Sequence, residues 1–240
     1  AKENLTINGA STFTQTVEVE KNLVITGESV FRDAVKSGEN LKITGNAAFE
    51  STEKSVEVGK DLTITGNAVF ENTEKSVEVG NDLEIIGNAN FANTVITGNN
   101  LTIEGDEIII NGVASAGKSE PFTEGSILLT KTTKITANSF SATENIFINK
   151  DSEVLEQTLN ITGDVVANNF EAVAKTQTFD GTISVTNLKI TGNAAFESTE
   201  KSVEIGNDLR IVGNAIFANT VTTGKDLTIT GNAVFENTEK

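Results

Sequence analysis

Apolar and polar residues alternate in short bursts along this chain, and turn-forming residues separate the bursts. In residues 61–82, Leu62 and Ile64 alternate with threonines, Ala68 and Phe70 flank a valine, and a third apolar pair follows. A period of two is typical of a β-strand with one buried face. Gly, Asn and Asp between the bursts favour tight turns. The pattern predicts three short strands and three corners in each repeat.

The repeat itself has a period of 18 or 21 residues, which the leucines mark. They stand at Leu5, Leu23, Leu41, Leu62, Leu83 and Leu101, and again at Leu188, Leu209 and Leu227. A fixed period near twenty is typical of a solenoid, whose units bury their apolar sides by stacking. We therefore expect an all-β, single-chain β-solenoid with triangular coils of 18–21 residues and three short strands each. In the 18-residue repeats, the first inward residues of successive strands are six positions apart, as in the left-handed β-helices of acyltransferases. Those helices, however, require a small residue two places before the aliphatic one. Leu62-x-Ile64 lacks it, so we favour a right-handed β-helix.

Phenylalanines recur at one place in the repeat, so stacked coils should align them in interior files. These expected core residues are Phe13, Phe31, Phe49, Phe70, Phe91, Phe196, Phe217 and Phe235. Asparagines recur at one corner, where their amides could bond along the stack: Asn46, Asn67, Asn88, Asn193, Asn214 and Asn232. The longer repeats add a Glu-Lys-Ser triplet at another corner, and this predicts a small polar ridge.

The repeat divides the chain into three parts. Residues 1–105 read as regular coils, residues 106–186 as degenerate coils with longer loops, and residues 187–240 as regular coils that end mid-coil. We interpret residues 114–126, which hold the single proline, as a loop leaving the rod. An open end of a solenoid presents unpaired strands and apolar surface. We therefore expect either that the polypeptide continues past Lys240 or that a second copy covers this end by self-association.

Charge and composition exclude several classes of partner and of catalytic mechanism. Acidic residues number 34 against 18 basic ones, and the net charge of −16 argues against nucleic acid and anionic membrane as partners. The chain has no Cys, Met, Trp, Tyr or His, which removes thiol nucleophiles, disulfides, imidazole bases and His-ligated metals. Nor is there an apolar stretch long enough to cross a bilayer. We expect that this protein is not an enzyme and binds no cofactor. The enzymatic alternative, which we disfavour, is cleavage of polysaccharides by a pair of carboxylates.

One motif suggests nucleotide binding. Residues 112–119 match the phosphate-binding pattern G-x-x-x-x-G-K-[ST] and follow an apolar strand. That chemistry requires a helix directly after the lysine, with its N-terminal amides facing the phosphates. Here Glu120, Pro121 and Phe122 lead only to Gly125. We interpret the match as chance.

A second motif suggests calcium. Asp61, Asp82, Asp208 and Asp226 recur at one corner together with asparagines, and a column of carboxylates and carbonyls can bind calcium. Alternatively, these side chains cap their own turns. The Gly-Gly-x-Gly-x-Asp spacing of calcium rolls is missing. Capping is therefore the favoured interpretation, and we expect no metal site.

Repeated phrases such as Gly66-Asn67-Ala68-Val69-Phe70 and Phe-x-Asn-Thr resemble repetitive regions of bacterial cell-surface proteins. Autotransporter passengers and the polymorphic outer-membrane proteins of chlamydia-like organisms are examples, and "LTITGNAVF" is also similar to bacteriophage tail-fibre shafts. The resemblance implies a secreted or cell-surface structural protein, a rigid rod or filament subunit. Its alternative is an adhesin passenger or viral fibre module that binds host glycans or proteins. A trimeric fibre would share its apolar files between chains.

Overall fold

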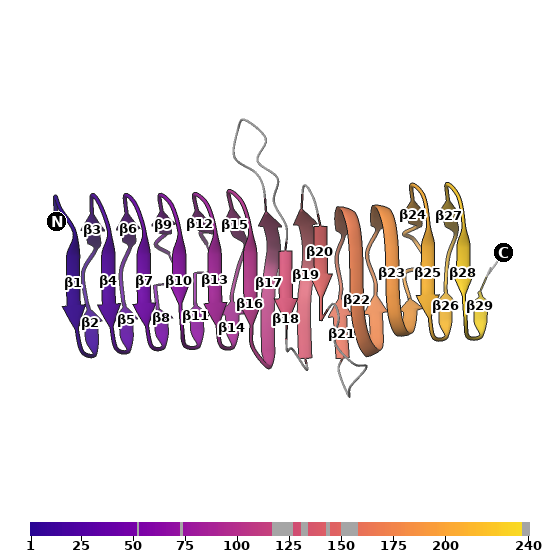
Figure 1. Ribbon diagram of the computed structural model, residues 1–240, viewed down its shortest axis with the longest axis horizontal. Helices are drawn as coiled ribbons and strands as arrows, with labels where there is room; N and C mark the ends of the chain where they lie inside the picture. The colour runs from indigo at the N-terminus through magenta and orange to yellow at the C-terminus, as the bar shows by residue number, and fades with distance from the viewer. Residues whose placement is uncertain are drawn as a thin grey trace.

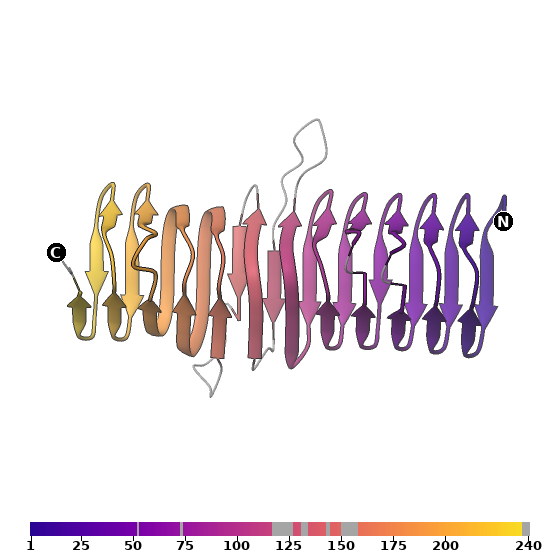
Figure 2. The same cartoon turned by 180° about the vertical axis from the view of Figure 1, so that it is seen from behind.

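The computed structural model is a rod in which short parallel strands stack coil upon coil along one axis (Figures 1 and 2). It describes residues 1–51, 53–72, 74–116, 127–130, 134–142, 145–149 and 158–236. The strands of this part form a single 29-stranded sheet that winds through about 11 turns, and no helix occurs among the described residues. The expectation of an all-β, single-chain solenoid is confirmed.

Each coil has three sides, and the first coil shows them as β1 (Leu5–Asn8), β2 (Ser11–Phe13) and β3 (Val17–Val19). The first side continues with β4 (Leu23–Thr26), β7 (Leu41–Thr44), β10 (Leu62–Ile64), β13 (Leu83–Ile86), β16 (Leu101–Glu104), β18 (Ile127–Thr130), β20 (Asn145–Ile148), β25 (Leu209–Val212) and β28 (Leu227–Ile229). The second side continues with β5 (Ser29–Phe31), β8 (Ala47–Phe49), β11 (Ala68–Phe70), β14 (Ala89–Phe91), β21 (Thr158–Ile161), β26 (Ala215–Phe217) and β29 (Ala233–Phe235). The third side continues with β6 (Val35–Ser37), β9 (Val56–Val58), β12 (Val77–Val79), β15 (Val95–Thr97), β24 (Val203–Ile205) and β27 (Val221–Thr223).

Longer strands in the middle of the rod pass around corners without interruption. β17 (Glu107–Ala116) and β19 (Lys134–Ala142) contribute to the second and third sides. β22 (Val165–Phe179) and β23 (Ile183–Phe196) run through all three sides. The parallel pairing therefore continues through the described residues of 106–186, with register shifts between Ile110 and Val113 and between Val173 and Thr176.

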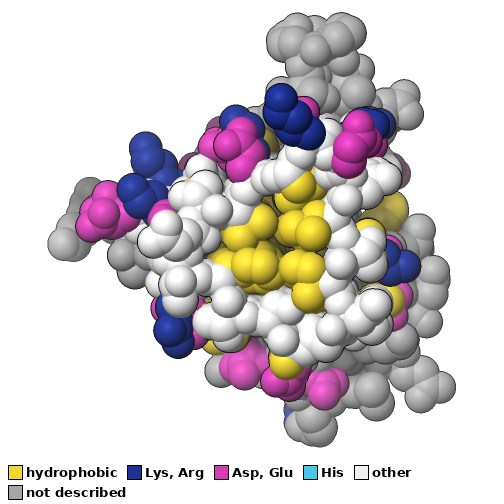
Figure 3. Space-filling view, turned by 90° about the vertical axis from the view of Figure 1, so that its left-hand side faces the viewer, with side chains coloured by type: hydrophobic (Ala, Val, Ile, Leu, Met, Phe, Trp, Pro, Cys, Tyr) yellow, Lys and Arg dark blue, Asp and Glu magenta, His cyan; other side chains and the backbone are white. Residues whose placement is uncertain are grey.

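The parallel register follows the sequence repeat residue by residue. Leu62 pairs with Leu41 in the preceding coil and with Leu83 in the next. Alternate residues of each strand are buried, so equivalent inward residues superpose along the axis. Seen end-on, the N-terminal coil has apolar side chains at its centre and charged ones at its periphery (Figure 3).

The second side carries the phenylalanine file. The ring centroids of Phe49 and Phe70 lie 4.5 Å apart, those of Phe70 and Phe91 lie 4.7 Å apart, and the ring planes are nearly parallel. The other consecutive pairs of Phe13, Phe31 and Phe49 and of Phe179, Phe196, Phe217 and Phe235 stack likewise. The files run as expected, with one addition and two differences. Phe179 joins the second file, Phe13 is only partly buried in the first coil, and Phe235 is 55 % exposed at the final described coil.

Between the two files the aromatic rings change sides. The register places Ile110 and Ile161 at the second-side position. Phe140 is instead buried on the third side, and Phe170 is buried on the first. Phe170 meets the edge of Phe179, with centroids 5.8 Å apart and planes at 88°. The aromatic rings of the middle coils therefore do not continue in a single file on the second side.

The structure corrects the interpretation of residues 114–126 as a loop. Ala114, Ser115 and Ala116 are the end of β17, pair with β15 and are almost wholly buried. Their small side chains fit against Val95 and Thr97, and this packing favours a strand over a departure from the rod. The remainder of that segment, 117–126, lies outside the described residues.

The polar ridge of the longer repeats lies at the corner between the second and third sides, as expected. Phe49 pairs with Phe31 and Val56 with Val35, so the additional residues fall between these positions. Two places after the phenylalanine of the second side, an asparagine donates hydrogen bonds to backbone carbonyls of the ridge in the preceding coil. Asn72 donates to the carbonyl of Lys54, and Asn219 Nδ2 donates to the carbonyls of Thr199 and Lys201 at 3.0 and 3.2 Å.

We expect Ser29→Ala to stabilise the rod. The Ser29 hydroxyl is buried without a hydrogen-bond partner, at a position where the next coil has Ala47. Removing an unsatisfied buried hydroxyl should contribute about 1 kcal/mol. The matched control is Ser37→Ala, because the Ser37 hydroxyl donates to carbonyls at 2.9 and 3.0 Å. Thermal unfolding followed by circular dichroism should move in opposite directions for the two variants.

Candidate functional surfaces

A ladder of asparagines lies at the corner between the first and second sides. Asn46 Oδ1 accepts the backbone N–H of Asn67 at 2.9 Å, and Asn67 Oδ1 accepts that of Asn88 at 2.9 Å. The same contact joins Asn193 to Asn214 and Asn214 to Asn232. The amides do bond along the stack. Each uses its oxygen on the backbone of the next coil, and Asn46 also donates its NH₂ group to Glu28 in the preceding coil at 3.4 Å.

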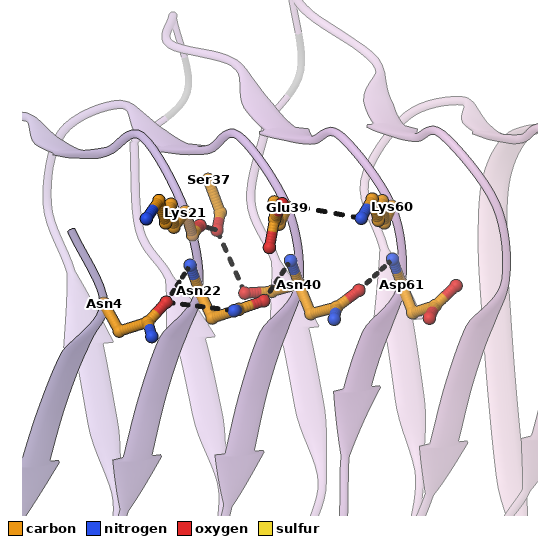
Figure 4. Close-up of polar contacts among 8 residues, drawn as sticks. All are labelled: Asn4, Lys21, Asn22, Ser37, Glu39, Asn40, Lys60 and Asp61. Atoms are coloured by element: carbon orange, nitrogen blue, oxygen red, sulfur yellow. Dashed lines mark hydrogen bonds and ion pairs between the residues drawn. The ribbon is translucent and has the colours of Figure 1, made fainter. Parts of the chain in front are cut away.

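A second ladder lies at the corner between the third and first sides (Figure 4). Asn4 Oδ1 accepts the backbone N–H of Asn22 at 3.2 Å, and Asn22 and Asn40 repeat this contact with the next coil at 3.1 Å. Asp61 continues the ladder. Each polar side chain therefore satisfies an amide that the turn leaves without a strand partner.

The calcium candidates belong to this second ladder. Asp61 Oδ1 accepts the N–H of Asp82 at 3.4 Å, Asp82 Oδ1 accepts the N–H of Asn100 at 2.9 Å, and Asp208 Oδ1 accepts the N–H of Asp226 at 3.3 Å. The expectation that these residues cap their own turns is wrong in one respect. The stacked corners bring the amide of the next coil within reach, so each side chain caps its neighbour. In the described part of the chain, no group of three or more His, Cys, Asp or Glu residues is arranged to hold a metal.

We expect Asp82→Asn to leave stability nearly unchanged, because an amide oxygen can accept the same bonds from Asn100. Asp82→Ala should lower the free energy of unfolding by about 1 kcal/mol. Thermal midpoints measured with calcium and with a chelator should coincide for the parent chain. A calcium-dependent rise in the midpoint that Asp82→Asn removes would contradict the capping role.

Ion pairs also connect successive coils. Arg32 pairs with Glu50 at 3.0 Å, Lys36 with Glu57 at 3.4 Å, and these side chains are substantially exposed. The Ser55 hydroxyl donates to Glu57 at 2.7 Å and, with Lys36, holds the pKa of the Glu57 carboxyl below its usual value, against the opposing effect of burial. The small stability that this contributes is present at neutral pH and is lost as the pH falls through the lowered pKa. Exposed pairs contribute little.

The third side carries a shallow groove in each half of the rod. One groove, of about 550 Å³, follows the outward faces of β6, β9, β12 and β15 and a column of corner glycines. The other, of about 660 Å³, follows the equivalent positions of β22, β23, β24 and β27. The glycines bring backbone close to backbone. A Cβ on Gly59 would lie 2.2 Å from the carbonyl oxygen of Gly38.

A third groove, of about 390 Å³, lies on the first side over β20, β22, β23 and β25. Phe147 lines it together with the ion pair of Glu171 and Lys189, the amides of Asn169 and Asn187, and Arg210. Phe147 is not among the residues expected at a functional site from the sequence. Its alternation with the buried Ile146 and Ile148 is the signal that places this ring outward.

The phosphate-loop match does not form a loop in the described part of the chain. Gly112 and the residues up to Ala116 belong to β17, and the alanines face the core. Lys118 and Ser119 lie outside the described residues. A strand does not gather its N–H groups toward one phosphate as a helix N-terminus does.

No family model matches this chain, and neither does any curated protein or any solved structure. The described residues include no helix long and apolar enough to cross a membrane.

Proposed function

We propose that this protein is a non-catalytic structural rod, a rigid segment or filament subunit of a bacterial cell surface. The observation that carries the proposal is the parallel strand pairing, which links the described coils from β1 to β29 on all three sides. Stacked rings, two amide ladders and inter-coil ion pairs follow the same axis. The sequence resemblance to secreted surface proteins supports the location.

Stacking of further coils on the ends is part of this proposal. In the final described coil, Leu227 and Phe235 are 43 and 55 % exposed, whereas the equivalent Leu209 and Phe217 of the preceding coil are buried. At the opposite end Leu5, Ile7 and Phe13 are only partly buried. A further coil, from the same polypeptide or from another copy, would cover these side chains and pair the edge strands.

Electron microscopy and sedimentation velocity test the structural role. The chain should behave as a stiff rod of about 55 Å, from strand spacings of about 4.8 Å, and should form longer rods as its concentration rises. Phe235→Glu should suppress this elongation because it places a charge on the stacking surface. Short rods that never lengthen, for both the parent chain and the variant, would contradict end-to-end assembly.

A second candidate function is recognition of a host glycan or protein, and the Phe147 groove favours it. An apolar ring beside amides and charged groups suits a ligand with both apolar faces and hydroxyls. Binding to a glycan array that Phe147→Ala abolishes, with the fold retained, would support this function. Val212→Ala, an outward residue of the same side away from the groove lining, is the control.

A further inference from the structure

The middle residue of each second-side strand points outward, because its two neighbours point into the core. In register, these residues form one continuous row along the rod, which we call the neutral row. It comprises Thr12, Val30, Ala48, Val69, Asn90, Ile109, Asn160, Thr178, Ala195, Ile216 and Val234, and Thr136 holds the register position between Ile109 and Asn160. None of these residues is charged, although 22 % of the chain is.

The other two sides differ. The middle outward positions of the third side include Glu18, Lys36, Glu57, Glu78 and Glu204, and outward positions of the first side include Lys42, Glu84, Lys189 and Arg210. Two copies of a chain with a net charge of −16 repel each other. The neutral row is the line along which they can approach without placing like charges in contact, and Ile216 and Val234 are 42 and 46 % exposed on it.

The margins of the neutral row are complementary to each other. Two residues before the described residues of the row, at the first corner, stand Ala10, Glu28, Asn46, Asn67, Asn88, Glu107, Thr158, Thr176, Asn193, Asn214 and Asn232. Two residues after them, at the second corner, stand Thr14, Arg32, Glu50, Glu71, Ala92, Asn111, Thr162, Asp180, Glu197, Ala218 and Glu236. One margin is therefore mostly amides, whose oxygens are already used along the stack, and the other is rich in carboxylates.

A two-fold axis parallel to the rod would bring these margins together. Two rods that point the same way, with their second sides face to face, would have antiparallel strands across the interface. Each first-corner residue would then meet the second-corner residue of the same coil in the other copy. Glu28 would meet Arg32, and Asn67 would meet Glu71, so that amide NH₂ groups donate to carboxylates. Rods pointing in opposite directions with full overlap would instead place Glu50 against Glu197.

The area is sufficient for a stable contact. The face is about 55 Å long and about 10 Å wide, which is the length of a three-residue strand. These dimensions give roughly 550 Å² on each copy, or about 1,100 Å² in total without the margins. Specific interfaces begin near about 1,000 Å². We propose that the second side is an isologous interface at which two copies of this chain pair laterally, aligned in the same direction.

Sedimentation equilibrium of the full chain and of two lysine variants tests the pairing. Ile216→Lys places like charges opposite each other at the two-fold axis and should weaken dimerisation about a hundredfold or more. Val212→Lys adds the same charge on the first side of the same coil, where Val212 is 37 % exposed, and should leave dimerisation unchanged. Salt should strengthen the dimer because it screens repulsion between copies. A monomer at all concentrations and salt levels, or equal effects of the two variants, would overturn the proposal.

Cross-linking then tests the orientation, since the chain has no cysteine of its own. Ala48→Cys and Ala195→Cys, each alone, should cross-link to themselves through a short bismaleimide. Cross-links that form only when the two variants are mixed would overturn the aligned arrangement. Small-angle scattering separates this proposal from end-to-end stacking, because lateral pairing preserves the maximum dimension of one rod. A dimer of doubled length that Phe235→Glu abolishes and Ile216→Lys does not would also overturn it.

Discussion

Phe70→Ala should lower the free energy of unfolding by about 3–5 kcal/mol, the largest effect that we expect from a single truncation. The ring is 1 % exposed and stacks between Phe49 and Phe91, so its removal opens a cavity between two coils. The surrounding strands are paired on both sides and cannot collapse into the space. Chemical denaturation followed by circular dichroism measures the loss.

Phe235→Ala is the matched control, because it removes the same side chain from the same kind of file. Phe235 has one stacking neighbour, Phe217, and is 55 % exposed. Its truncation at low protein concentration should cost much less than that of Phe70. Equal losses for the two variants would show that the interior file is not the main source of stability.

Gly59→Ala should lower the free energy of unfolding by about 1–3 kcal/mol. A Cβ at Gly59 would lie 2.2 Å from the oxygen and 2.8 Å from the carbon of the Gly38 carbonyl, and both are backbone atoms held by strand pairing. Relief would require the two coils to separate at this corner. Urea unfolding of the single variant gives the value.

Gly206→Ala is a control with the same local sequence, because residues 187–206 repeat residues 40–59 with one difference. Here the nearest atom to the added Cβ is Thr186 Cα at 3.4 Å, an ordinary contact. The substitution should be neutral or slightly stabilising, since alanine restricts the unfolded chain. A loss as large as that of Gly59→Ala would mean that backbone preference, and not the contact with the preceding coil, decides the effect.

The regular coils could be predicted from the sequence because the same residue types recur at equivalent positions of every repeat. Alternation in Leu62-x-Ile64 and Ala68-x-Phe70 identifies strands and their buried faces, and the constant spacing sets the register. The position of the polar ridge follows from the same comparison of repeat lengths. Local propensity, pattern and turn residues agree here, as they do in minimally frustrated sequences.

The middle of the rod was harder to predict, because the repeat length varies there. Leu101 pairs with Ile127 and Ile146 with Phe170, and no fixed period links these positions. Phe179 stands two residues after Gln177, where the regular coils have alanine or serine, so its place in the file was not evident. The candidate surfaces were even harder to predict from the sequence. A side chain that caps the next coil, or a row that is neutral on one side only, becomes apparent once the register is known.

The hydrogen bonds between coils lie along the length of the rod, because parallel strands pair across the stacking direction. A force that pulls on the two ends would load the bonds of one coil at a time and peel it from its neighbour. A force that bends or squeezes the rod would act against all three sides together. The molecule should therefore serve better as a strut than as a tether.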